Sequence, residues 1–326
     1  MTVLFGVFLL AMLVITALAM VQTRNLFVAV MLGGIFSLLI ATVFFMLDAA
    51  DVSLTEAAVG AGISTVLFLG ALSLTSDHEH SKTTIRPLAI LIVFITMLVI
   101  FGSTFDFPFI GDPDAPVQKH VGIWYLEKTP EYVDIPNVVT AVLGSYRGYD
   151  TLGEVFVVLT AGIGVLFLLG KSVPSGCYRN KPSDTEGLSH YLIPRLVGRL
   201  VIPFLLLFGL YVQFHGEYSP GGGFQAGALI ASANILYALL EGEKRALLVV
   251  PHNWLIGMMA SGALLYGLVG VAGILLGSNF LDYSVLADDP VKGQQIGLLV
   301  IELGVGITVT GVLLSIYHAF ASRGKI

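Results

Sequence analysis

The stretch Tyr149 to Glu154 (YDTLGE), followed by an apolar run from 155 to 170, decides the fold class. It places a carboxylate one helical turn inside a segment that is otherwise suited to lipid. Two more glutamates recur in this setting, because Glu56 begins the apolar run 57–76 and Glu302 interrupts the run that ends at Ser322. A charge at membrane depth is costly and is rare unless it has a use. We therefore predict a set of membrane helices that holds these three glutamates.

The composition is that of an integral membrane protein. The 326 residues are 56% hydrophobic and 12% charged, with a mean hydropathy of +0.89, whereas a soluble domain carries about 25% charged residues. The formal net charge of −6 gives no sign of nucleic-acid binding. A single cysteine, Cys177, excludes an internal disulfide and a cysteine-based metal site. No phosphate-binding loop, nucleophile motif or haem-ligand pair is present, so we expect neither a cofactor nor an enzyme.

The expected fold class is an all-α integral membrane protein with about nine transmembrane helices. A spanning helix needs about 20 mostly apolar residues. The segments that qualify are 2–21, 26–47, 52–74, 87–105, 150–170, 196–214, 220–240, 253–277 and 293–320.

The distribution of Lys and Arg predicts an N-terminus outside and a C-terminus inside. Basic residues concentrate in the loops on the cytoplasmic side of a membrane protein. With this orientation the outer side receives only Lys119, Lys128, Arg147 and Lys292. The inner side receives all the others, namely Arg24, Lys82, Arg86, Lys171, Arg179, Lys181, Arg195, Arg199, Lys244, Arg245, Arg323 and Lys325.

The connections divide the predicted helices into groups of three, two and four. The first group occupies 1–80, and the second occupies 81–175 with a long outer loop at 106–149. A polar inner linker at 176–194 separates these from the last group at 195–326. Several prolines in the outer loop argue against one long helix there.

Glu56 lies among small residues in the segment 55–62 (TEAAVGAG). Small residues let another helix backbone approach closely. They also weaken the helix, and such a site can host a π-bulge beside a functional group. The alternative is a protonated glutamate that only hydrogen-bonds a neighbouring helix.

Glu154 and Glu302 leave the same two interpretations open. Asp150 and Arg147 are close enough in sequence to couple to Glu154, or they are ordinary interfacial residues. Burial would raise the pKa of a carboxyl and allow reversible protonation near neutral pH. No cation lies within a turn or two of Glu302 on its own helix, so its partner must come from another helix, another chain or water.

Polar residues at the predicted outer mouths are further candidates. The hairpin 215–225 carries His215 and Glu217, which could pass protons or attract cations, although most loops of this kind are plain turns. Asp51 and Asp150 precede their glutamates and would raise the local cation concentration.

Glu56 and Glu154 are accordingly the candidates for binding a proton or, transiently, a sodium ion. We expect each to lie about one turn inside the outer end of its helix.

Four stretches resemble one family. Residues 137–154 (NVVTAVLGSYRGYDTLGE) resemble the late part of the A subunit of Mrp-type (multiple resistance and pH) cation/proton antiporters. Residues 54–60 (LTEAAVG) are similar to an earlier element of the same A-type chain, and also to the J-type subunit of respiratory complex I. Residues 215–224 (HGEYSPGGGF) and 301–309 (IELGVGITV) are similar to the Mrp B subunit.

The resemblance implies a B subunit fused to the C-terminal modules of an A subunit. Segments 1–80 and 81–175 would then be A-type modules, and 195–326 a B-type module. The resemblance also implies a role for Glu56 and Glu154 in sodium or proton passage, and with less weight for Glu302 and His215.

The large antiporter-like domain of a full A subunit has no counterpart in the sequence, so we expect the chain not to run the transport cycle alone. The partners implied are the other subunits of an Mrp-type complex, the lipid bilayer, Na⁺ and H⁺, and no nucleic acid. The expected location is the prokaryotic plasma membrane.

Two alternatives remain at this point. Related modules occur in membrane-bound hydrogenases and related respiratory complexes, where ion transport is coupled to redox chemistry. A third interpretation is a scaffold subunit whose glutamates are structural and which carries no ion.

Overall fold

The structure is a computed structural model that describes residues 2–79, 86–109, 111–169 and 191–323. In these residues, nine helices are long and apolar enough to cross a membrane, which confirms the predicted fold class. Eight spans are α1 (Thr2–Gln22), α2 (Leu26–Met46), α5 (Pro87–Ser103, continued by η2, Thr104–Asp106), α9 (Gly148–Leu169), α10 (Leu192–His215), α11 (Gly223–Glu241), α13 (His252–Leu275) and α14 (Pro290–Ala321). The remaining span joins α3 (Ala50–Thr55), the π-helix η1 (Glu56–Ile63) and α4 (Ser64–Leu72).

Short helices form the connections. The long loop contains α6 (Pro116–Lys119), α7 (Val121–Tyr132), α8 (Val138–Ala141) and the π-helix η3 (Val142–Tyr146). The loop is therefore not one long helix, as expected, although Pro130 lies inside α7. Two other connections contain α12 (Glu243–Val249) and η5 (Tyr283–Leu286).

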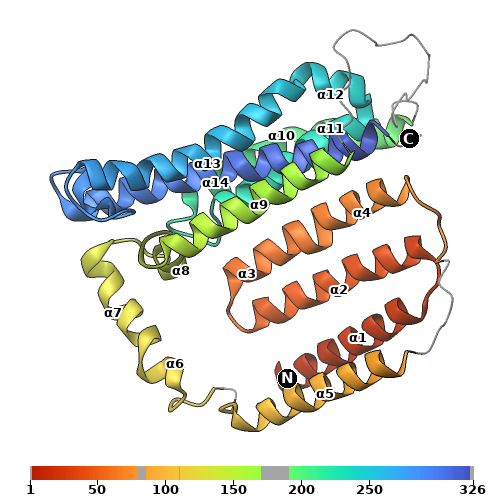
Figure 1. Ribbon diagram of the computed structural model, residues 1–326, viewed down its shortest axis with the longest axis horizontal. Coiled ribbons are helices and arrows are strands. Elements are labelled where there is room, and N and C mark those ends of the chain that lie inside the picture. The colour runs from red at the N-terminus through yellow and green to blue at the C-terminus, as the bar shows by residue number, and fades with distance from the viewer. Residues whose placement is uncertain (1, 80–85, 110, 170–190, 324–326) are drawn as a thin grey trace.

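The loops gather at two ends, and the helices run between them in alternating directions (Figure 1). We call one end, with the loops 47–49, 106–147, 216–222 and 276–289, the acidic end. The opposite end, with 23–25, 73–79, 242–251 and 322–323, is the basic end. The N-terminus lies at the acidic end and the C-terminus at the basic end. Which end faces the cell interior stays a prediction.

Helix α14 is the centre of the larger packed half. It is 32 residues long, and its buried positions contact α9, α11 and α13. Glycines allow this close packing, because a Cβ at Gly304 would lie 2.8 Å from the carbonyl oxygen of Gly262 on α13. Likewise, a Cβ at Gly227 on α11 would lie 2.8 Å from the carbonyl oxygen of Gly306. Small residues at helix contacts are typical of membrane bundles.

The first three spans form a separate layer. Their turn at the basic end is fastened by a short antiparallel bridge in which Leu26 N donates to Asp77 O (2.9 Å) and Glu79 N donates to Arg24 O (2.9 Å). The layer docks on the larger half through η1 and α4, where Ile63 joins a buried cluster with residues of α11 and α14.

Helices α5 and α9, which the sequence grouped together, lie on opposite sides of the molecule (Figure 1). Helix α5 has no buried residue, whereas α9 packs on α13 and α14. The division into modules at 80, 175 and 194 stays a prediction.

The sixth span begins earlier than its predicted start at 196. Residues 176–190 lie outside the described residues, but α10 already begins at Leu192. Pro194 suggested a linker, yet proline is tolerated in the first turn of a helix because the amides there have no helical partner. Helix α11 begins at Gly223 rather than at the expected Pro220, because Gly222 has φ 146° and leaves the helical region.

Candidate ion pathway at the acidic end

Asp51 lies where three parts of the chain meet. Its Oδ1 accepts hydrogen bonds from Gly221 N at 3.1 Å and from Asn137 Nδ2 at 3.2 Å. The Asn137 amide group also donates to the carbonyl oxygens of Gly216 (3.1 Å) and Ser219 (3.2 Å). We call this set of contacts the acidic-end junction. It joins the first-layer helix α3, the start of α8 and the loop between α10 and α11.

The local sequence explains why Asn137 can serve this junction. Its Oδ1 caps α8 by accepting from Val139 N at 3.0 Å, which is the usual role of Asn before a helix. Its backbone amide donates to Glu217 O at 2.9 Å, and Thr140 Oγ1 donates to Gly216 O at 2.9 Å. Because Oδ1 caps α8, the Nδ2 group of Asn137 remains free to donate a hydrogen bond to Asp51.

Glu302 caps α11 from the neighbouring helix α14. The backbone amide of Gly223 donates a hydrogen bond to Glu302 Oε2. A Cβ at Gly222 would lie 2.9 Å from the same oxygen, so glycine gives the carboxylate room. The partner comes from another helix, which is one of the sources that the sequence left open. A carboxylate is favoured at a helix N-terminus because the amides there carry partial positive charge.

A polar contact leads from this cap toward Glu56. The Gln225 Nε2 amide donates to Thr55 Oγ1 at 2.7 Å. A Cβ added at Gly222 would lie 3.3 Å from Gln225 Oε1 and 3.3 Å from Glu302 Oε1, so both side chains are close to this glycine. Since Thr55 directly precedes Glu56, the Gln225–Thr55 hydrogen bond joins the start of α11, which Glu302 caps, to the third span.

Glu56 begins the eight-residue π-helix η1. The expected weak helix beside this residue is thus confirmed. The Glu56 carboxylate folds over Gly60, where a Cβ would collide with it and would lie 2.9 Å from Ser37 Oγ of α2. A mainly apolar cavity of about 580 Å³ adjoins this site, with Ser37, Gly60 and Thr65 in its lining. Glu56 therefore faces α2 rather than the larger half.

Glu154 is exposed on the surface of α9. Arg147 does not pair with it, because Arg147 Nε donates to Asp150 Oδ2 at 2.6 Å. Both members of that pair are exposed, as expected for interfacial residues. Asp150 lies within Coulombic range of Glu154.

Two buried tyrosines lie between α9 and α14. The Tyr266 hydroxyl donates to Gly148 O at 2.8 Å, and the Tyr283 hydroxyl donates to Gly144 O at 3.1 Å. Both side chains are fully buried. These hydrogen bonds tie α13 and η5 to the backbone of η3 and of the start of α9.

The hairpin residues differ in their surroundings. The His215 ring lies 4.8 Å from the Tyr211 ring and 5.4 Å from the Tyr218 ring, and no described hydrogen bond joins its side chain to a carboxylate. Glu217 is half-buried, and this burial raises its pKa above the ordinary value.

A metal site built only from protein side chains does not appear among the described residues. No group of three or more His, Cys, Asp or Glu side chains there could hold a metal ion. Sodium at Glu56 or Glu154 would therefore need carbonyl, hydroxyl or water oxygens as additional ligands.

The sequence interpretation missed Gln225, Thr55, Asn137 and Tyr266 as parts of this site. Only Asn137 carries a local signal, since Asn before a helix is a capping residue. Tyr266 is a hydroxyl-bearing residue inside an apolar span, and a buried hydroxyl needs a hydrogen-bond partner, so the sequence could have marked it as a candidate. The Gln225–Thr55 contact depends on packing between distant helices.

Comparison with known proteins identifies the family. Residues 193–315 match a family model described as a domain related to the MnhB subunit of Na⁺/H⁺ antiporters. Residues 11–77 match a second model, which describes the D subunit of MBH. A putative antiporter subunit mnhB2 of Staphylococcus haemolyticus is 34% identical over 137 residues, which cover 41% of this chain and 96% of that protein. The chain belongs to the MnhB-related family of Mrp-type antiporter subunits.

Two larger relatives match nearly the whole of this Mrp-type chain. A probable A/B subunit of a K⁺/H⁺ antiporter from Rhizobium meliloti is 25% identical over 90% of the chain. A structure of the Mrp complex from Dietzia sp. DQ12-45-1b matches 96% of the chain with a TM-score of 0.76 and 25% identity. The chain spans 32% of the first relative and 34% of the matched chain in the second. The A/B-type fusion is thus confirmed.

The chain also resembles part of a respiratory complex. The structure of the membrane-bound sulfane sulfur reductase, an archaeal respiratory membrane complex, matches 71% of this chain and 97% of that chain, with 30% identity and a TM-score of 0.54. The multispan fold and these relatives place the chain in the prokaryotic cell membrane.

Proposed function

We propose that this Mrp-type chain belongs to a multisubunit monovalent cation (Na⁺)/proton antiporter and contributes intramembrane carboxylates to the ion pathway. The observation that carries the proposal is the placement of two polar contacts at the start of α11: Glu302 caps this helix at Gly223, and Gln225 donates to Thr55, the residue before Glu56. Charged groups inside membrane segments are functional candidates because they cost free energy to place there. Its relatives are antiporter subunits, which are transporters rather than enzymes.

Each carboxylate in this proposal alternates between holding a proton and holding a cation. Asp51, Asp150 and Glu217 at the acidic end raise the local cation concentration. Glu302 then exchanges its contact with the α11 amides for a proton or a cation.

The proposed partners are the other subunits of an Mrp-type complex. Two observations support this assembly: Glu154 is exposed on α9, and α5 has no buried residue. A charged side chain at membrane depth needs cover from protein or water rather than lipid tails. A neighbouring protein that packs on this face of α9 would provide that cover.

A redox-coupled complex is the second candidate, favoured by the likeness to the sulfane sulfur reductase and by the match to the MBH family model. The subunits that co-purify with the chain distinguish the two. Hydrogenase-like subunits would support the second candidate, and antiporter subunits alone would support the first.

Transport by the complete complex tests the carboxylates. Glu56→Gln, Glu154→Gln and Glu302→Gln keep the shape of the side chain but remove its titratable charge. We expect each to reduce cation/proton exchange in membrane vesicles at least tenfold, while the complex still assembles. The Asp variants should retain partial activity.

Glu127→Gln is the matched control, since this glutamate lies on α7 at the acidic end and outside the spans. Exchange at the wild-type rate in all three Gln variants, across the pH range, would favour the scaffold interpretation.

A further inference from the structure

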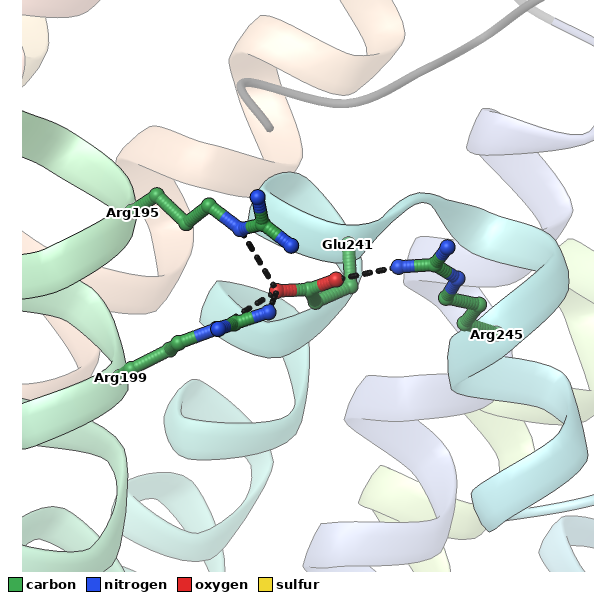
Figure 2. A network of polar contacts seen from close by, with 4 residues as sticks. All are labelled: Arg195, Arg199, Glu241 and Arg245. Carbon is green, nitrogen blue, oxygen red and sulfur yellow. Dashed lines mark hydrogen bonds and ion pairs between the residues drawn. The ribbon is translucent and has the colours of Figure 1, made fainter. Parts of the chain in front are cut away.

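Three arginines converge on one buried carboxylate at the basic end (Figure 2). Glu241 is the last residue of α11, and its side chain is only 5% exposed. Arg199 on α10 donates to Glu241 Oε1 through Nε (2.9 Å) and Nη2 (2.6 Å). Arg245 Nη1 on α12 donates to Oε2 at 2.5 Å, and Arg195 Nε lies 3.5 Å from Oε1. We call these four side chains the arginine cluster.

The arginine cluster holds more positive charge than its carboxylate balances. Three guanidinium groups face one anion, so these four side chains carry a formal charge of about +2. The Arg195 Nε is buried without a hydrogen-bond partner in the described part of the chain. Each guanidinium has five N–H donors, of which Arg199 gives two hydrogen bonds and Arg245 one to Glu241. Further donors thus remain for a second anion.

The arginine cluster is also open on one side. The side chains of Arg199 and Arg245 are 54% and 60% exposed, respectively. If Arg199 and Arg245 only fastened α10 and α12 to α11, their hydrogen bonds to Glu241 would be enough, and the rest of each guanidinium group would not need to be accessible. The exposed guanidinium faces therefore point to a ligand that approaches from outside the helix bundle.

Apolar side chains flank the exposed arginines. Leu196 and Leu200 on α10 are 61% and 59% exposed, and Leu248 on the short helix α12 is 82% exposed. The cluster lies at the ends of membrane spans, where phosphate groups of lipids meet the hydrocarbon. Basic side chains beside exposed apolar ones match a ligand with an anionic head and apolar tails, rather than a free anion.

We propose that the arginine cluster binds the headgroup of an anionic phospholipid in the leaflet at the basic end. The phosphate accepts hydrogen bonds from Arg199 and Arg245, and the acyl chains cover Leu196, Leu200 and Leu248. Arginine suits this role because its planar fork donates two parallel hydrogen bonds to a phosphate. Glu241 holds the guanidinium groups in place while no lipid is bound.

Lipid binding to the purified full-length chain, in the complex with which it is isolated, tests the proposal. Delipidated protein in detergent is titrated with phosphatidylglycerol, phosphatidylcholine or inorganic phosphate. Bound lipid is counted by native mass spectrometry. We expect phosphatidylglycerol to bind with at least fivefold higher affinity than phosphatidylcholine, and inorganic phosphate not to displace it.

Arg199→Gln and Arg245→Gln each leave two arginines on Glu241, so that the fold is kept. We expect each to lower phosphatidylglycerol affinity about fivefold, as expected for one basic residue at a lipid surface. Lys128→Gln, the same change at the acidic end, should have no effect.

Wild-type affinity in both arginine variants would overturn the proposal, as would equal affinity for the two lipids. Displacement of phosphatidylglycerol by equimolar inorganic phosphate would assign the cluster to a soluble anion instead. Because these outcomes are read from bound lipid, they are independent of whether the chain takes part in ion exchange.

Discussion

Gly223 has no space for a side chain, because the backbones of α11 and α14 meet at this residue. A Cβ there would collide with the carbonyl oxygen of Glu302 and would lie 2.9 Å from Gly306 N. These are backbone atoms, which cannot turn aside as the end of a flexible side chain can. The same close approach lets the Glu302 carboxylate reach the first amide of α11. Glycine at position 223 is therefore required both for the packing of α11 on α14 and for the hydrogen bond to Glu302.

Gly223→Ala should destabilise the protein by about 1–3 kcal/mol or more, the usual cost of overpacking a tight contact. Gly257→Ala on α13 is the matched control, since nothing lies within 4 Å of the added methyl group. The control should be neutral or stabilising, because Ala favours a helix over Gly by about 1 kcal/mol. Thermal unfolding of the two variants in the same detergent checks this, and equal Tm values would contradict it.

Single residues also show what the sequence could predict. The glutamates stand out because a charge inside an apolar run is visible in the sequence itself. Their surroundings are not, since Gln225 meets Thr55 only after helices from distant parts of the chain have packed. Nor does the sequence show that Glu154 is exposed on this chain, because an apolar segment does not tell which of its faces lies against the bundle.

At the scale of elements, η1 is the most informative segment. Its small residues indicated a weak helix, and the structure has eight residues of π-helix beginning at Glu56. A π-helix has one more residue per turn-closing hydrogen bond than an α-helix. The extra residue sets the rotation of Glu56 relative to α4. Element boundaries were harder to predict, as at Leu192, because proline is compatible with both a linker and a first helical turn.

Deletion of Ala58 should convert η1 into a regular α-helix and rotate the residues before it by about 100° relative to those after it, one residue of a 3.6-residue turn. We expect the deletion variant to have the wild-type helix content by circular dichroism but to lose cation/proton exchange in vesicles. Ala58→Ser keeps the register and should preserve exchange. Wild-type exchange in the deletion variant would show that the π-helix does not position Glu56.

At the scale of the whole molecule, the charges at the two ends determine the orientation that we expect. Helices of alternating direction bring the basic loops at 23–25, 242–251 and 322–323 to one end, together with the start of α10 (Figure 1). The number of spans and the gathering of basic loops were predictable, because hydropathy and charge are properties of composition. The arrangement of the spans was not, as the separation of α5 from α9 shows.

Labelling of single cysteines in intact cells checks the orientation. In a Cys177→Ser background, Asp114→Cys at the acidic end should react with a membrane-impermeant reagent, and Lys244→Cys at the basic end should not. Both positions are exposed, so a difference in labelling reports the side of the membrane. The reverse pattern would place the acidic end inside the cell.

The length of α14 has an electrical consequence. Its 32 residues measure about 48 Å at about 1.5 Å per residue, against a hydrocarbon thickness of about 30 Å. If the helix length in excess of the hydrocarbon thickness is shared equally, about 9 Å of α14 projects at each end. Glu302 is about 18 Å along the helix from Pro290. It therefore lies about 9 Å inside the hydrocarbon. A cation that moves from the acidic end to Glu302 therefore crosses only about a third of the membrane potential, worth about 0.8 kcal/mol per 100 mV. Most of the voltage drop lies beyond Glu302, between this residue and the basic end.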